Sequence, residues 1–217
     1  MNRIFFVVTG LLLATQLYAR SEPKMPPRVP VCIADTSDHR SAAEALSLTS
    51  LMFQRMGVKL VWRRGLADCE AGSLRIDISE NTPSDFHPGA MAYALPYAGF
   101  QAFTAPEMSA SSLESFHIRV FHDRIQATGE RLAPRVFAYV LTHEITHVLQ
   151  GSTHHAAEGI MKARWTQHDY NTMLQRQLVL TREDIDLLHR GIAARNEFLN
   201  EEQLALKSEA GTKAGGM

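Results

Sequence analysis

The segment Leu132–Gly151, LAPRVFAYVLTHEITHVLQG, is the stretch that decides the fold. Its apolar residues recur at helical spacing, and Pro134 suits the first turn of a helix while Gly151 suits its end. We therefore predict a largely buried helix over this segment. His143 and His147 are four residues apart on it, so both imidazoles are expected on the same side of the helix.

These two histidines enclose a glutamate in the pattern HExxH, which predicts a zinc site. Imidazole nitrogens are preferred Zn²⁺ ligands, and two of them one helical turn apart can bind a common ion. Glu144 is rotated by about 100° from His143, so it is better placed to act on a water that the metal activates than to bind the metal itself. This is the general-base role of the glutamate in HExxH hydrolases. A purely structural reading would bury two imidazoles beside a glutamate without partners, at a cost in free energy.

The rest of the chain alternates predicted strands and helices. We expect strands at 29–35, 58–64, 73–79, 90–96 and 116–125, and further helices at 40–57 and 181–198. The first helix joins two strands and is expected to cross over and pack on the sheet, which indicates an α+β domain with a C-terminal helix. By alternation, His117 and His122 lie on opposite faces of the last strand and are expected to be ordinary surface or hydrogen-bonded histidines.

The N-terminal segment is predicted to be a signal peptide spanning residues 1–19, because a short basic start precedes an apolar run that ends at Ala19. Residues 20–30 contain several prolines and are expected to form an extended leader. The catalytic domain is placed at 31–200, followed by a flexible tail at 201–217. This organisation predicts a secreted or periplasmic protein without stable membrane association once the signal is removed.

Composition limits the number of domains and the kinds of partner that the protein can have. The 217 residues are 45% hydrophobic and 21% charged, with a formal net charge of −1, which suits one domain and gives no basic surface for nucleic acid. Cys32 and Cys69 are the two cysteines of the chain, and in an oxidising compartment we expect them to form a disulfide. The sequence does not indicate an oligomeric state.

In the HExxH motif, and in the order of predicted elements from the strand at Val29 to the helix at Thr181, the chain resembles the metzincin clan of zinc metallopeptidases, in particular its small matrixin-like members. Their motif HExxHxxGxxH is followed by a turn that contains methionine, and here HEITHVLQGSTHH is followed by GIM at 159–161. The resemblance implies a twisted mixed sheet packed on the crossover helix and the HExxH helix. It also implies that Met161 forms a hydrophobic floor below the metal, and that an edge strand containing Ala92, Tyr93, Ala94 and Leu95 binds extended substrate.

The motif departs from the usual spacing after the second histidine. Gln150 and Thr153 stand where the glycine and the third histidine are expected, and Gly151 comes one residue late. The spacing from the glycine favours His154 as the third ligand. The pattern HEIGHxLLGxxxHSxxGIM of small bacterial members favours His155, which we take as the third ligand with His154 as its competitor.

We therefore expect a secreted zinc endopeptidase that acts on peptide or protein substrates with one catalytic Zn²⁺ ion. The alternatives are a zinc-binding scaffold with little turnover and a zinc hydrolase of a non-protein amide, such as a cell-wall peptide. Trp165 is expected to pack near the site, and Tyr170 is a minor candidate for stabilising an oxyanion. Specificity is expected to reside in the loops at 81–90, 97–115 and 166–180.

Overall fold

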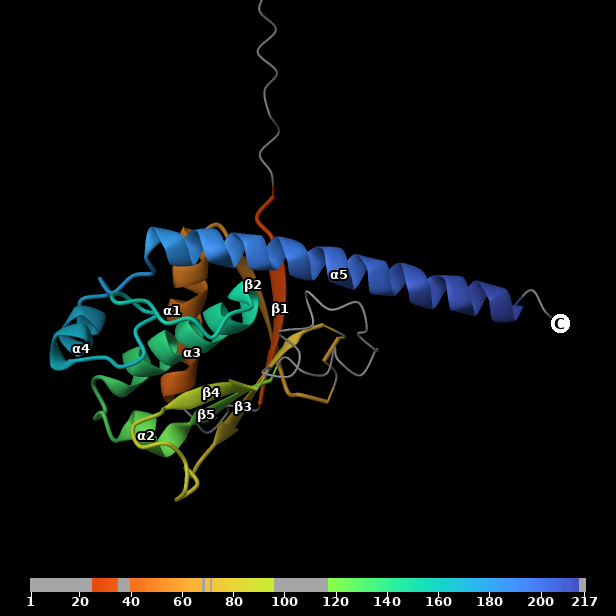
Figure 1. Cartoon of the computed structure of the whole chain (residues 1–217). Helices are drawn as coiled ribbons and strands as arrows, with labels where there is room; N and C mark the ends of the chain where they lie inside the picture. Colours follow the sequence, from red (N-terminus) through yellow and green to blue (C-terminus); the bar gives the residue numbers. More distant parts are fainter. Residues whose placement is uncertain (1–24, 35–39, 68, 71, 96–116, 215–217) are drawn as a thin grey trace, which may run out of the picture.

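The computed structural model describes residues 25–34, 40–67, 69–70, 72–95 and 117–214, which form a five-stranded mixed sheet and five helices (Figure 1). The strands are β1 (Arg28–Ile33), β2 (Lys59–Arg64), β3 (Leu74–Ser79), β4 (Ala92–Leu95) and β5 (His117–Phe121). The helices are α1 (Arg40–Arg55), α2 (His122–Gln126), α3 (Ala133–Gln150), α4 (Gln167–Leu174) and α5 (Arg182–Ala214). The predicted α+β class is confirmed. The predicted signal peptide and the loop 97–115 lie outside the described residues.

The strands are arranged in the order β2-β1-β3-β5-β4. All neighbouring pairs are parallel except β4 and β5, which are antiparallel. Helix α1 connects the adjacent parallel strands β1 and β2, as expected for a crossover connection. Strand β4 lies at one end of this order and therefore has one side that no other strand of the described sheet occupies.

The core lies between the sheet and helices α1 and α3. Alternate residues of the inner strands, such as Val31, Ile76 and Ile118, are fully buried and belong to the same cluster as the apolar residues of both helices. Parallel register places these side chains on one face, because Ile33 is paired with Ile76 and Ile76 with Ile118. Burial of this continuous apolar layer is the main stabilising contribution to the fold.

Helix α3 is the central helix and is buried on nearly all sides (Figure 1). It begins at Ala133 with Pro134 in its first turn and ends at Gln150, close to the predicted limits. Gly151 takes the left-handed conformation at φ 71°, which is the expected glycine end of a helix. The HExxH segment therefore lies in a helix whose residues are almost all buried.

Helix α5 and the disulfide close the side of the domain next to β1. The predicted disulfide between Cys32 and Cys69 is confirmed, with 6.1 Å between the two Cα atoms. Arg195 of α5 is buried, and its guanidinium donates to the carbonyl of Gly72 in the loop that leads from the disulfide to β3. Beyond this contact, α5 extends away from the other elements (Figure 1).

Several predicted boundaries are wrong. Strand β1 begins at Arg28, inside the expected leader 20–30, and Pro30 is tolerated because β1 pairs with β3 only from Val31 onward. The strand expected over 116–125 ends at Phe121, where the chain turns into α2, so the opposite-face argument does not hold for His122.

The C-terminal helix does not end near 198 but continues to Ala214. Loss of apolar residues there suggested a flexible tail from 201, although Glu, Gln, Ala, Leu and Lys are all strong helix formers. Within the described residues, no helix is both long enough and apolar enough to cross a membrane.

Candidate metal centre

Helix α3 presents His143 and His147 next to each other, one turn apart. Their ring centroids are 4.6 Å apart, and the ring planes are inclined by 80°. His143 is buried and His147 is half-buried. The spacing of four residues in the sequence is thus enough to bring the two rings together.

Two backbone carbonyls outside the helix fix the orientation of these rings. The Nδ1 atom of His143 is 2.9 Å from the carbonyl oxygen of Ile160, and Nδ1 of His147 is 2.9 Å from that of Ser152. A carbonyl oxygen can only accept, so both Nδ1 atoms donate and each Nε2 atom presents a lone pair. Hydrogen bonds of this kind orient the histidines of metal sites.

His155 adds a third imidazole to the pair. Its Nε2 atom is 3.2 Å from Nε2 of His147, which is 3.0 Å from Nε2 of His143. One ring nitrogen of each residue lies within 4.8 Å of the others. The three side chains are therefore close enough to hold a metal ion.

All three rings favour the neutral form. Burial, assisted by the neighbouring imidazoles, lowers the pKa of His143 to about 3, and burial lowers that of His147 to about 4. Burial also lowers the pKa of His155. At neutral pH the facing Nε2 atoms of His143 and His147 are thus both lone-pair acceptors only 3.0 Å apart. Such acceptors repel each other, and a cation bound between them would attract both lone pairs and offset this repulsion.

The structure separates the two candidates for the third histidine. His155 lies in the cluster, whereas His154 is exposed and does not belong to it. The backbone N–H of His154 donates to the hydroxyl of Ser152, which stabilises the turn after α3. Gln150, at the position that departs from the usual motif, has its side-chain amide bound to the carbonyl of Asp184 in α5. The extra residue before the glycine therefore contributes to helix packing.

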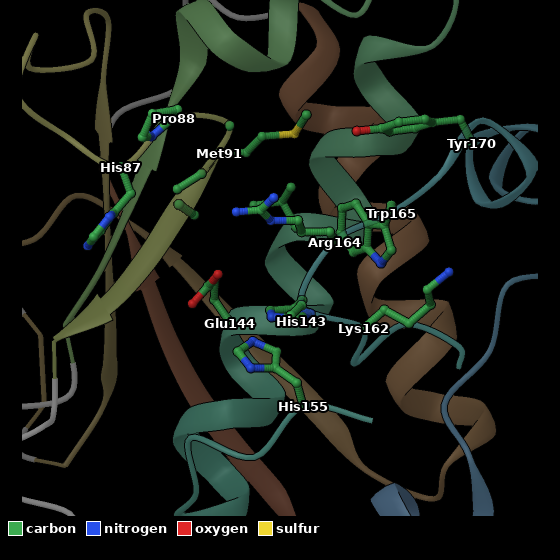
Figure 2. Close-up of a pocket in the computed structure, with 15 residues that line it drawn as sticks. His87, Pro88, Met91, His143, Glu144, His155, Lys162, Arg164, Trp165 and Tyr170 are labelled. Carbon is green, nitrogen blue, oxygen red and sulfur yellow. The ribbon is translucent and has the colours of Figure 1, made fainter. Parts of the chain in front are cut away.

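Glu144 is a buried carboxyl beside the cluster, with a relative exposure of 9% (Figure 2). Burial raises its pKa to about 8, and a hydrogen bond from the backbone of Ala94 partly opposes this shift. A cation at the histidine cluster would lower the pKa further, because an opposite charge favours the carboxylate. A cation bound at the cluster would therefore favour the ionised carboxylate of Glu144.

The segment GIM at 159–161 lies next to the cluster, contacts His143 and is buried at Ile160 and Met161. Met161 is fully buried, and the carbonyl of Ile160 accepts from both His143 Nδ1 and the indole N–H of Trp165. Gly159 has φ +75°, and a Cβ atom there would lie 2.4 Å from the carbonyl oxygen of Val179. Only glycine can lie this close to the carbonyl of Val179, which explains why a glycine precedes Ile160 and Met161.

A pocket of about 580 Å³ opens over Glu144 and His143 (Figure 2). One wall is formed by the chain from 87 to 92, which leads into β4, and the opposite wall by residues after Met161. Arg124 donates to the carbonyls of His87 and Ala90 and so fixes the first wall. The residues that line the pocket are His87, Pro88, Gly89, Ala90, Met91, Ala92, Val140, His143, Glu144, His155, Lys162, Ala163, Arg164, Trp165 and Tyr170.

Strand β4 turns an open backbone edge toward this site. The N–H of Phe121 donates to the carbonyl of Met91, so these two residues form a hydrogen-bonded pair of the antiparallel ladder. Hydrogen-bonded and non-hydrogen-bonded pairs alternate, so the peptide groups of Ala92 and Ala94 point away from β5. This agrees with the bond from Ala94 to Glu144. Ala92 also lines the pocket, so the predicted substrate strand lies beside it.

The other predicted residues are distributed as follows. Trp165 packs edge-on to His143 with 5.8 Å between ring centroids, as expected for a neighbour of the site. Tyr170 of α4 lines the pocket and points into it (Figure 2). His117 and His122 lie outside the cluster, and His122 contacts Glu80 at 3.1 Å.

Sequence reasoning missed the residues that build the walls and supports of the site. Helix α4 falls in a segment that we expected to be a loop, although Thr166 and Asp169 form a capping box that could have indicated its start. Arg164, on the same wall, carries no motif and could not have been singled out. No protein-family model matches the chain, and no curated protein is similar enough to count as a relative.

Proposed function

We propose that the protein is a zinc-dependent endopeptidase of the metzincin type, similar to the small matrixin-like enzymes. The observation that carries this proposal is the convergence of the neutral imidazoles of His143, His147 and His155 beside the buried carboxyl of Glu144. The order HExxH, His155 and Met161 supports the family assignment, as does an antiparallel edge strand next to the motif helix.

The donor set fits zinc. The separations of 3.0 and 3.2 Å between ring nitrogens approach the value of about 3.3 Å that separates nitrogen ligands in a tetrahedral zinc site. Three protein ligands leave one position open, which distinguishes catalytic from structural zinc sites. Zn²⁺ bound there would supply Lewis acidity that polarises the scissile carbonyl and lowers the pKa of water.

Glu144 supplies the proton transfers of the proposed reaction. As a carboxylate it removes the proton from the attacking water, and as a carboxylic acid it returns that proton to the amine that leaves. The hydrogen bond from Ala94 holds the carboxylate in position against β4. Because water is the nucleophile, the reaction needs no covalent intermediate with the protein.

The open edge of β4 is the proposed substrate-binding element. An extended peptide can add as a further strand to the outward-facing peptide groups of Ala92 and to the outward-facing carbonyl of Ala94, whose N–H already donates to Glu144. The small side chains of both alanines let the strand lie close to α3, which is how Ala94 reaches Glu144. A peptide on this edge would pass in front of Glu144 and the histidine cluster.

The disulfide between Cys32 and Cys69 supports action outside the cytoplasm, because such bonds persist in oxidising compartments. We therefore propose a secreted or periplasmic enzyme that acts on peptide or protein substrates. A zinc-binding scaffold is the main alternative. A scaffold would not need Glu144. Burial of this carboxyl, with a pKa of about 8, lowers the stability of the fold at neutral pH, so its presence favours a catalytic role.

The test is an assay of the purified, zinc-loaded, disulfide-bonded protein on a diverse pool of fluorogenic peptides. Glu144→Gln removes the base, and Glu130→Gln is the matched control because Glu130 is exposed and outside the pocket. We expect cuts within peptides, lost on chelation and reduced by about 10³-fold in Glu144→Gln, with Glu130→Gln unaffected. Full activity in Glu144→Gln would contradict the mechanism. No cleavage by protein that binds one zinc would favour the scaffold or a non-protein amide.

A further inference from the structure

We propose that Arg164 determines specificity by binding a carboxylate of the substrate in the pocket that contains Glu144. This inference rests on the proposed peptidase function and goes beyond it, because it names the class of substrate. The carboxylate can belong to an Asp or Glu side chain or to the free C-terminus of a peptide, and the experiment below separates these two sources.

The backbone of Arg164 is fixed although its side chain is exposed. On one side, Met161 is fully buried, and on the other the indole of Trp165 donates to the carbonyl of Ile160 at 3.2 Å. Thr166 then caps α4 through its reciprocal hydrogen bonds with Asp169. Arg164 therefore projects from a short segment that is held at both ends, and Figure 2 shows its guanidinium pointing into the pocket, toward the wall that contains Met91.

Arg164 is the unneutralised positive side chain among the described residues of the pocket. Lys162 also lines it, but its ammonium group is 2.6 Å from the carboxylate of Asp169. Within the described part of the chain, the guanidinium of Arg164 has no ion-pair or hydrogen-bond partner. Glu144 is the acidic residue of the lining, and the backbone of Ala94 already binds it. The pocket thus has a positive group that a substrate can neutralise.

A carboxylate is the ligand that best matches this group. The planar guanidinium can bind both oxygens of a carboxylate through parallel hydrogen bonds. A neutral side chain forms weaker bonds with it, and a basic side chain is repelled. Because Arg164 is exposed, solvent screens the pair, and we expect a preference of about tenfold rather than several thousandfold.

The experiment compares peptides that differ only in charge. Each peptide cleaved in the pool assay is remade with Glu, Gln or Lys at each position on either side of the cut, and each version is made with a free and an amidated C-terminus. We expect Glu to exceed Gln by about tenfold in kcat/KM at one position, or the free acid to exceed the amide by the same factor. The first result identifies a side-chain carboxylate as the ligand, and the second identifies the C-terminus.

Three substitutions of Arg164 and one control test the assignment. Arg164→Gln should reduce the preference to less than about twofold, Arg164→Lys should retain part of it, and Arg164→Glu should favour Lys instead. Arg131→Gln is the matched control, since Arg131 is exposed in the turn before α3 and does not line the pocket. Arg131→Gln should cleave acidic and neutral peptides as the wild-type protein does. An acidic preference that survives in Arg164→Gln would overturn the assignment.

A binding measurement separates failure of this inference from failure of the proposed function. The same peptides are titrated into zinc-loaded Glu144→Gln protein, with and without Arg164→Gln, and followed by fluorescence anisotropy. We expect a carboxylate-bearing peptide to bind about tenfold more tightly than its neutral counterpart only when Arg164 is present. Equal binding would refute the role of Arg164 whether or not the protein cleaves peptides. Cleavage of acidic and neutral peptides at equal rates would refute it and leave the peptidase intact.

Discussion

Replacing Glu144 by glutamine should stabilise the metal-free protein while removing the proposed activity. Burial raises the pKa of this carboxyl from 4.5 to about 8. For an acid whose pKa is raised on folding, its contribution to stability is fully present below the pKa of the unfolded chain. That contribution is lost progressively as the pH rises from the unfolded-state pKa to the folded-state pKa, because in this range the unfolded chain ionises while the folded protein stays protonated. Above the folded-state pKa the loss is complete. Glutamine is neutral in both states and avoids this loss.

The size of the effect follows from the two pKa values. With 4.5 in the unfolded chain and about 8 in the folded protein, the carboxyl destabilises the fold by about 1.4 kcal/mol at about pH 5.5 and about 3 kcal/mol at about pH 7. The group is almost fully buried, so solvent screening reduces these values little. Glutamine can still accept the hydrogen bond from Ala94, which makes it a close replacement in shape.

The assay is denaturant unfolding of the disulfide-bonded protein in the presence of a chelator, at both pH values. The histidines titrate in both variants, so their contribution cancels in the difference between them. We expect the stability gain of Glu144→Gln to grow by about 2 kcal/mol between about pH 5.5 and about pH 7. A gain that is the same at both pH values, or a loss of stability, would refute the assignment of Glu144 as a buried carboxyl kept for function.

Three further predictions follow. His155→Ala should weaken zinc binding by at least about 100-fold in a chelator competition, whereas His154→Ala should change it by less than about threefold, and equal effects would contradict the cluster. Gly159→Ala should destabilise the protein by at least about 2 kcal/mol more than Gly65→Ala. Both positions have positive φ, but only at Gly159 would the new Cβ meet a backbone carbonyl, and equal unfolding midpoints would contradict this. Replacing both cysteines by alanine should lower the free energy of unfolding by about 4 kcal/mol, since the bridge spans 37 residues, and unchanged denaturation would contradict it.

The parts of the site that depend on local spacing could be predicted from the sequence. The spacing of four positions from His143 to His147 fixes their relation on any helix, and the apolar pattern around them indicates a buried helix. The choice of His155 over His154 followed from the distance to Met161, and the structure places His155 in the cluster.

The parts that depend on distant segments could not be predicted. The carbonyls of Ser152 and Ile160 orient the two α3 histidines, but a backbone carbonyl leaves no mark in the sequence. The bond from Ala94 to Glu144 requires β4 to lie against α3, which only tertiary packing determines. The same holds for Arg164, whose importance appears only once the pocket is assembled.

The errors in the predicted helices arise where apolar periodicity disagrees with helix propensity or with a capping signal. Apolar periodicity ceases near 200 and predicts an early end of the C-terminal helix, yet residues of high helix propensity follow and α5 continues to Ala214. Helix α4 was overlooked although Thr166 and Asp169 supply a start signal, because no strong apolar stripe follows it.

The most direct test of the central claim is a titration of the metal-free protein with zinc, in which bound metal and peptide cleavage are measured in the same samples. The account predicts that cleavage rises in proportion to bound zinc and stops rising at one equivalent. It also predicts that Glu144→Gln binds the same equivalent without cleaving. Cleavage in the absence of metal, or equal cleavage by Glu144→Gln at one equivalent of zinc, would contradict it.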